Sequence, residues 1–233
     1  MNDEKCYVVI GGTSGIGRAT AELYHGRGHR VVLTGRDAQR CRTIAGEIGE
    51  RATGIALDLA EPERIAAALA TIDRVDGLVI AAIERDANSV REYDIGRAKR
   101  LVTIKLVGYT EAIHTLLPKM TDNASVVLFG GLAKERPYPG STTVTSVNGG
   151  ITSMIRTLAT ELAPIRFNAV HPGIIGDSPA WEDKAAALEA TKKRTPGGQL
   201  ATIQDVVGAV DFLLTNQGVN GVNLFVDRGW MLT

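Results

Sequence analysis

The sequence lacks the features that would place it among metal-binding, nucleic-acid-binding or membrane proteins. It has two cysteines, Cys6 and Cys41, which form neither a disulfide framework nor a metal-ligand spacing. Its 26 basic and 26 acidic residues give zero net charge, so no electrostatic footprint for nucleic acid or an anionic membrane is present. No apolar run approaches the roughly 20 residues of a membrane span. Because strand-like residues begin almost at the N-terminus, we expect no signal peptide and a cytoplasmic location.

Apolar, β-branched segments alternate with amphipathic ones along the whole chain. Strands are expected at 7–10, 30–34, 53–57, 77–82, 125–129, 166–170 and 222–226, and helices near 15–27, 37–49, 61–71, 98–119, 145–163 and 202–215. Most of the strands are apolar at nearly every position, which is typical of strands covered by helices on both faces. The pattern predicts an α/β fold with one doubly wound, Rossmann-like domain over 1–233, in which helices flank a parallel sheet of about seven strands.

The first expected strand runs directly into the loop GGTSGIG. Gly11, Gly15 and Gly17 follow a G-x-x-x-G-x-G spacing between this strand and an amphipathic helix. Glycine permits a tight turn and lets backbone N–H groups approach a pyrophosphate at the helix N-terminus. Because strand, loop and helix follow the order of a βαβ unit, we interpret the loop as a dinucleotide phosphate site rather than a structural turn.

The ends of the second and third expected strands bear on the choice of dinucleotide. An NAD site usually has a carboxylate after the second strand to accept from the ribose hydroxyls. This chain has Arg36 there, and Asp37 follows one place too late. A guanidinium binds phosphate oxygens, so Arg36 favours NADP(H) over NAD(H), the alternative being a solvated surface arginine. Asp58 is a candidate for the adenine amino group or for a helix cap.

These motifs resemble those of the short-chain dehydrogenase/reductase family over essentially the full chain. GGTSGIG is similar to the family's glycine motif, TGR at 34–36 to its NADP-preferring form, and IRFNAVHPG at 165–173 to the segment that meets the nicotinamide. GVNLFVDRG at 221–229 resembles the last strand, although Arg228 breaks the usual double glycine. The resemblance implies an NADP-dependent oxidoreductase of carbonyl or alcohol substrates, with a small substrate lobe at about 174–200. It also implies a homodimer or homotetramer.

The resemblance defines a set of expected cofactor-binding residues. They are Gly11, Thr13, Ser14, Gly15, Ile16, Gly17, Arg36, Asp58, Leu59, Ala81, Pro172, Gly173 and Ile174. Asp177 stands where the family often has a threonine that bonds the cofactor. A carboxylate there would repel the cofactor phosphates unless it turns away.

The stretch GSTTVTSVNGGI at 140–151, which should carry the family's chemistry, has no tyrosine, lysine or histidine. The family uses Asn, Ser, Tyr and Lys, and the tyrosine transfers the proton. LATELAP at 158–164 resembles the helix end that follows the family's Tyr-x-x-x-Lys motif, and counting back 17 residues from Glu161 places Val144 at the tyrosine and Asn148 at the lysine. Counting 13 forward from Gly131, at the usual serine, also reaches Val144.

Lys105 stands at the family's asparagine position, so asparagine and lysine are exchanged between Lys105 and Asn148. Desolvation of Lys105 among Ile80, Ala81 and Val144 would lower its pKa, and the lysine would then donate a proton near neutral pH. The alternative is a lysine that extends to solvent or pairs with a carboxylate.

Tyr138, flanked by two prolines, is another catalytic candidate, with a packed loop tyrosine as the alternative. His171 is expected to pack or bond locally at a strand end. Three functions stay open. They are an atypical NADP(H)-dependent oxidoreductase, an inactive NADP(H)-binding sensor or scaffold, and a cofactor-independent lyase or isomerase that uses Lys105.

Overall fold

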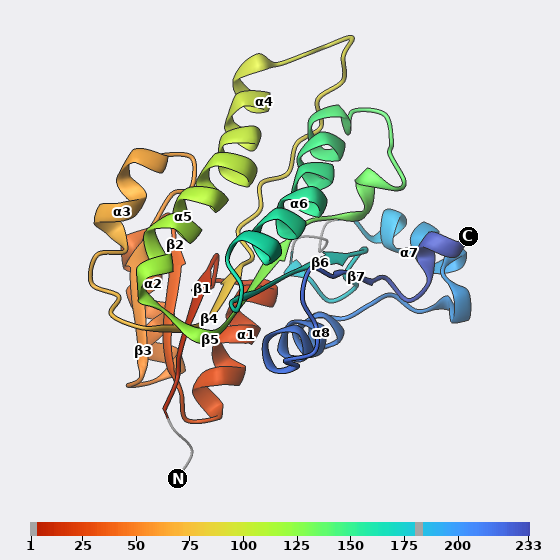
Figure 1. Ribbon diagram of the computed structural model, residues 1–233. Helices are drawn as coiled ribbons and strands as arrows, with labels where there is room; N and C mark the ends of the chain where they lie inside the picture. Colours follow the sequence, from red (N-terminus) through yellow and green to blue (C-terminus); the bar gives the residue numbers. More distant parts are fainter. Residues whose placement is uncertain (1–3, 180–183) are drawn as a thin grey trace.

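The computed structural model describes residues 4–179 and 184–233 and is built around a parallel sheet (Figure 1). The strands are β1 (Cys6–Ile10), β2 (Arg30–Gly35), β3 (Ala52–Ala56), β4 (Val75–Ile80), β5 (Met120–Phe129), β6 (Arg166–Pro172) and β7 (Asn223–Val226). They form one seven-stranded sheet in the order β3-β2-β1-β4-β5-β6-β7. The predicted fold class is confirmed. The strand order reverses between β1 and β4, which places a crevice beyond the carboxyl ends of these strands.

Helices cover both faces of the sheet (Figure 1). They are α1 (Gly15–Gly26), α2 (Ala38–Ile48), α3 (Ile65–Ala68), α4 (Ile95–Val102), α5 (Tyr109–Leu116), α6 (Thr142–Glu161), α7 (Ala185–Arg194) and α8 (Ile203–Thr215). Within the described residues, none of these helices combines the length and apolar character needed to cross a membrane.

Alternate residues of the central strands face the two helical layers. Val8 and Ile10 of β1 pack in one core with α5 and α6, whereas Tyr7 and Val9 pack in a second core with α1 and α8. All four side chains are buried. Because successive side chains of a strand point to opposite faces, a strand covered on both sides must be apolar at nearly every position.

The segment predicted as one helix at 98–119 is helical without a break from Ile95 to Leu116, but its hydrogen-bond pattern changes in the middle. α4 ends at Val102, a π-helical turn covers Thr103–Gly108, and α5 begins at Tyr109. The turn packs closely on the loop after β3, since a Cβ at Gly108 would lie 2.3 Å from the carbonyl oxygen of Leu59. Hydrophobic periodicity does not distinguish an α-helix from a single π turn, because the apolar face continues through both.

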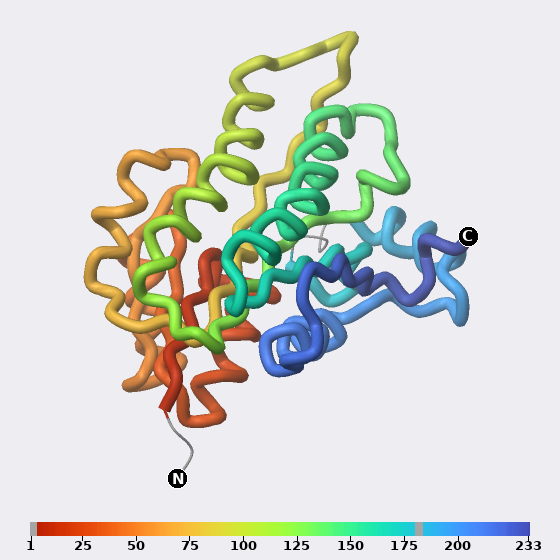
Figure 2. The backbone as a smooth tube through the Cα atoms, in the orientation of Figure 1, coloured from red at the N-terminus to blue at the C-terminus, as the bar shows by residue number. Residues whose placement is uncertain are grey.

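The C-terminal residues lie beside the segment of α7 (Figure 2) and contact the loop between β5 and α6. Arg136 of that loop donates to the carbonyl oxygen of Trp230 at 2.9 Å and lies over its ring. The substrate lobe expected at about 174–200 contains α7, and its residues 180–183 lie outside the described residues.

Gly54 provides a test of the packing of α2 on β3. A Cβ at Gly54 would lie 2.1 Å from the carbonyl oxygen of Cys41, and the backbone of α2 cannot shift to relieve this contact without a loss of stability. We expect Gly54→Ala to lower the free energy of unfolding in urea by about 1–3 kcal/mol, as overpacking does. In the matched control Gly46→Ala a Cβ meets nothing within 4 Å. Alanine's helix propensity should there raise the free energy by about 0.5–1 kcal/mol. An unchanged midpoint for Gly54→Ala would contradict the close contact.

Candidate active site

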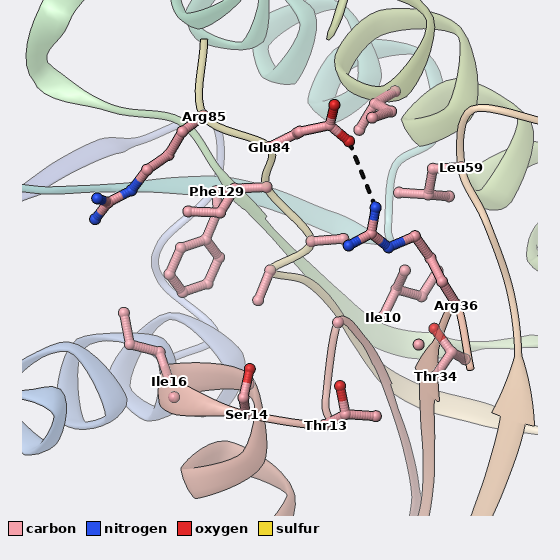
Figure 3. A pocket seen from close by; sticks show the side chains of 18 of the residues that line it. Ile10, Thr13, Ser14, Ile16, Thr34, Arg36, Leu59, Glu84, Arg85 and Phe129 are labelled. Atoms are coloured by element: carbon pink, nitrogen blue, oxygen red, sulfur yellow. Dashed lines mark ion pairs between the residues drawn. The ribbon is translucent and has the colours of Figure 1, made fainter. Parts of the chain in front are cut away.

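A cavity of about 490 Å³ lies beyond the carboxyl ends of the central strands. Every residue of the expected cofactor set lines it except Ile174, whose neighbour Ile175 does. Figure 3 shows Thr13, Ser14 and Ile16 at the start of α1 on one side of this cavity and Glu84, after β4, on the other. The motifs that are separated in the sequence therefore surround a single cleft.

The glycine loop holds the N-terminus of α1 against the strand ends. Gly11 has a φ of +87° and donates to the carbonyl oxygen of Thr34, and a Cβ at Gly17 would lie 2.2 Å from the carbonyl oxygen of Gly11. Ser14 precedes α1 without capping it through its side chain. The first amides of a helix without a side-chain cap can bind an anion.

Charged side chains occupy the end of the cleft near β2 and β3. Arg36 points across the cleft toward Glu84, with 3.7 Å between their charged atoms (Figure 3). Arg100 of α4 bonds both carboxylate oxygens of Glu84 at 2.9 and 3.0 Å and reaches Asp58 at 3.3 Å. Asp58 also accepts from the amide of Ala60. Arg36 itself is 71% exposed, which leaves its guanidinium accessible to a ligand.

Asp177 turns away from the cleft. Its carboxylate accepts from the amide of Ile203, the first residue of α8, at 2.8 Å. A carboxylate is stabilised at a helix N-terminus by the positive end of the helix dipole. The repulsion that a carboxylate at this position would exert on phosphates is therefore relieved.

A second cavity of about 530 Å³ adjoins the first. Residues 83–85 and Gly130 line both cavities. Lys105, Tyr138, Val144 and Asn148 all line the second cavity, so the structure brings the sequence-derived catalytic candidates together. Tyr138 lies in an exposed loop, with 52% of its surface accessible.

Lys105 lies in the π-helical turn and is 3% exposed. Its Nζ donates to the carbonyl oxygen of Phe129 at 2.5 Å and to the hydroxyl of Tyr109 at 3.0 Å. Burial lowers the pKa of Lys105 to about 7. The alternative that Lys105 extends to solvent or pairs with a carboxylate is therefore wrong for this structure.

A buried histidine explains why position 130 holds a glycine. The Nδ1 of His171 accepts from the amide of Gly131 at 3.1 Å, and Nε2 donates to Asn223 at 2.7 Å. Burial lowers the pKa of His171 to about 4, which keeps the ring neutral. A Cβ at Gly130 would lie 2.3 Å from this ring. His171 bonds locally, as expected.

Asn148 faces the other side of the same glycine pair. A Cβ at Gly131 would lie 2.8 Å from Nδ2 of Asn148. Asn148 is 5% exposed, and its side chain makes no hydrogen bond within the described part of the chain. Its amide is therefore available to a molecule in the second cavity.

Sequence reasoning missed several polar residues that line the two cavities or lie behind them. Tyr109 follows Lys105 by four residues, and this spacing on a helix places both side chains on one face. Glu84, Arg100 and the buried Asp86, which pairs with Arg97 at 2.7 Å, carry no comparable local signal. Their partners come from other segments of the chain.

Comparison with known proteins identifies the family. A family model described as enoyl-(acyl carrier protein) reductase matches residues 11–231. The chain is 32% identical to the 3-oxoacyl-[acyl-carrier-protein] reductase of Bos taurus, with 99% of each chain covered. It is 30% identical to carbonyl reductase family member 4 of Danio rerio, with 97% of each covered. A crystal structure of a short-chain dehydrogenase/reductase from Brucella melitensis matches with a TM-score of 0.92 at 28% identity, covering 97% of this chain and 96% of that one. The chain belongs to the short-chain dehydrogenase/reductase family.

The burial of Lys105 predicts that the free energy of unfolding depends on pH. Between pH about 7 and 10 the unfolded chain binds a proton at Lys105 that the folded chain does not, so the contribution of Lys105 to stability rises with pH. We expect the free energy of unfolding of the wild type, relative to Lys105→Met, to rise by about 1.4 kcal/mol per pH unit in this window. Urea denaturation at pH 6, 7.5 and 9 measures the difference.

The exposed Lys99 of α4 provides the matched control. Lys99→Met measures how the loss of a surface lysine alone changes the free energy of unfolding at each pH. A pH dependence for Lys105→Met that is no steeper than that for Lys99→Met would contradict the prediction.

Proposed function

We propose that this protein is an NADP(H)-dependent oxidoreductase that interconverts a carbonyl compound and an alcohol, with Lys105 as the proton donor. The observation that carries the proposal is a buried lysine with an N–H to spare, which lines a cavity adjoining the cleft at the glycine loop. The names of the relatives, a 3-oxoacyl-[acyl-carrier-protein] reductase and a carbonyl reductase, support a carbonyl substrate.

The cleft fits a dinucleotide phosphate. At Gly11 and Gly17 a Cβ would collide with backbone, so only glycine allows the loop to pack this closely. The close packing leaves the backbone amides at the N-terminus of α1 next to the cleft, where they can bind a phosphate. Arg36 would bind the additional phosphate of NADP(H) through charge-assisted hydrogen bonds. When bound, the nicotinamide supplies or accepts the hydride.

We further propose that the family's Asn-Ser-Tyr-Lys set is absent, its positions being held by Lys105, Gly131, Val144 and Asn148. Valine has no titratable proton, and glycine offers only its backbone. The ammonium of Lys105 would give its proton to the substrate oxygen as negative charge develops there, while the amide of Asn148 donates a hydrogen bond. A donor whose pKa lies near the working pH is suited to this task.

The assignment of Arg36 can be tested by titration with NADPH and NADH. A charge-assisted hydrogen bond contributes about 1.5–3 kcal/mol, so Arg36→Ala should weaken NADPH binding by about 10- to 100-fold and leave NADH binding unchanged. Arg42→Ala is the matched control, because Arg42 is exposed on α2 and bonds Gln39. If neither nucleotide binds the wild type, the cofactor assignment fails.

The role of Lys105 can be tested with a panel of carbonyl compounds that includes 3-oxoacyl thioesters and cyclic ketones. Loss of a positioned acid lowers turnover by about 10²–10⁴-fold, and we expect this for Lys105→Met with NADPH affinity retained. Because the donor must be protonated, wild-type reduction should slow as the pH rises through about 7. Turnover that is unaffected by Lys105→Met would remove Lys105 from the mechanism.

One observation favours a second function, that of an inactive NADP(H)-binding sensor or scaffold. Two of the three N–H groups of Lys105 are already bonded to protein atoms, and Val144 and Gly131 carry no side chain that transfers a proton. Tight NADPH binding without reduction of any carbonyl in the panel would establish this alternative.

We also propose that the protein is a homodimer or homotetramer. Exposed apolar side chains lie on α4, on the π-helical turn and on α8, at Val102, Val107 and Phe212. Such side chains are suited to an interface between copies of the chain.

A further inference from the structure

We propose that Tyr109 is the positioning residue for Lys105: its hydroxyl accepts one N–H of the ammonium and so directs the remaining N–H into the second cavity. The inference rests on the proposed function, in which Lys105 is the proton donor. It concerns how this amine is held, which no motif of the sequence indicates.

While Lys105 is an ammonium, its hydrogen bond with Tyr109 has only one consistent direction. The hydroxyl of Tyr109 lies 2.8 Å from the carbonyl oxygen of Ala82 and 3.5 Å from that of Phe129; both can only accept, and the shorter distance directs the phenolic proton to Ala82. The phenolic oxygen must then accept from Lys105. An ammonium has three N–H groups, and the carbonyl of Phe129 takes another. The third has no partner within the described residues, and Lys105 lines the cavity.

The backbone holds this arrangement in place. Lys105 lies in the π-helical turn and Tyr109 begins α5, four residues later on the same face. Of the two acceptors, Ala82 lies two residues beyond the end of β4, and Phe129 is the last residue of β5. A Cβ at Gly11 would lie 2.6 Å from the amide nitrogen of Ala82, so the carbonyl that orients Tyr109 belongs to backbone packed against the glycine loop.

Tyr109 acts through Lys105 and not on the substrate. Its side chain is fully buried and lines neither cavity. Burial raises the pKa of Tyr109 far above the neutral range, so its proton stays on the hydroxyl. A group in this position can orient and stabilise an ammonium without exchanging its own proton.

Other titratable and charged groups line the second cavity or lie near Lys105 without bonding to it. After β4 these are Glu84, Arg85 and Asp86, and from other elements they are Arg97, Tyr138, His171 and Lys184. Within the described residues, the Nζ of Lys105 bonds only to Tyr109 and Phe129. Because Phe129 contributes backbone, Tyr109 is the one side chain in this set whose replacement removes a direct partner of the ammonium.

The test is a pH titration of Lys105 in the full-length protein by NMR, with ¹³C at the lysine Cε. The Cε resonance of Lys105 is identified as the one that is present in the spectrum of the wild type and absent from that of Lys105→Met. Tyr109→Phe removes the acceptor while keeping the ring, so the charged form of Lys105 is less favoured. We expect its titration midpoint to fall by about one pH unit. The pH at which carbonyl reduction slows should fall by the same amount as the midpoint, with little change in KM.

Tyr24→Phe is the matched control. Tyr24 is equally buried and its hydroxyl bonds Asp211, on the opposite face of the sheet, so the midpoint of Lys105 should not change. If Tyr109→Phe does not fold, protein labelled with 3-fluorotyrosine keeps the hydroxyl as a weaker acceptor and should show a smaller downward shift.

An unchanged midpoint in the folded Tyr109→Phe variant, or in the fluorotyrosine protein, overturns the proposal. The titration needs no turnover, so the two inferences fail separately. A lowered midpoint in a protein that reduces no carbonyl supports the positioning by Tyr109 and contradicts the proposed function. An unchanged midpoint in a protein whose carbonyl reduction depends on Lys105 contradicts the positioning by Tyr109 and supports the proposed function.

Discussion

The hydrogen bond from the ammonium of Lys105 to the carbonyl oxygen of Phe129 is the interaction on which the site depends. It joins the π-helical turn to the carboxyl end of β5, where the two cavities meet. A buried amine is tolerated only when its donors are bonded, because the interior does not replace the solvation that water provides. The bonds to Phe129 and Tyr109 meet this requirement for two donors and leave the third for the cavity.

The parts of the structure that depend on local pattern could be predicted from the sequence. Strands such as 7–10 are apolar at every position because both faces are covered. A Cβ would collide with backbone at Gly11 and Gly17, and Gly15 has a φ of +53°, which favours glycine. These constraints act within a few residues. The expected cleft therefore contains the expected residues, with Ile174 replaced by its neighbour Ile175.

The environment of Lys105 could not be predicted in the same way. Its second acceptor belongs to Phe129, 24 residues away, and the π turn that contains it has the same apolar pattern as an α-helix. Likewise, Glu84 meets Arg100 and Arg36 only because β4, α4 and β2 converge at the cleft. A charge network of this kind depends on tertiary geometry, and no short spacing in the chain encodes it. The four-residue step from Lys105 to Tyr109 is the exception, since helical spacing alone places the two on one face.

The residues of the site fit one another, and this bears on the choice between the two proposed functions. The ring of His171 lies where a Cβ at Gly130 would be, the amide of Asn148 lies against Gly131, and Tyr109 receives the ammonium of Lys105. A protein that only held a nucleotide would not need an amine at position 105, because replacing a buried charge by a hydrophobic side chain is commonly neutral or stabilising. Burial of an amine beside a cleft, with its pKa brought near neutrality, instead matches the demands of proton transfer. The arrangement therefore supports the proposed oxidoreductase over the alternative of an inactive sensor or scaffold.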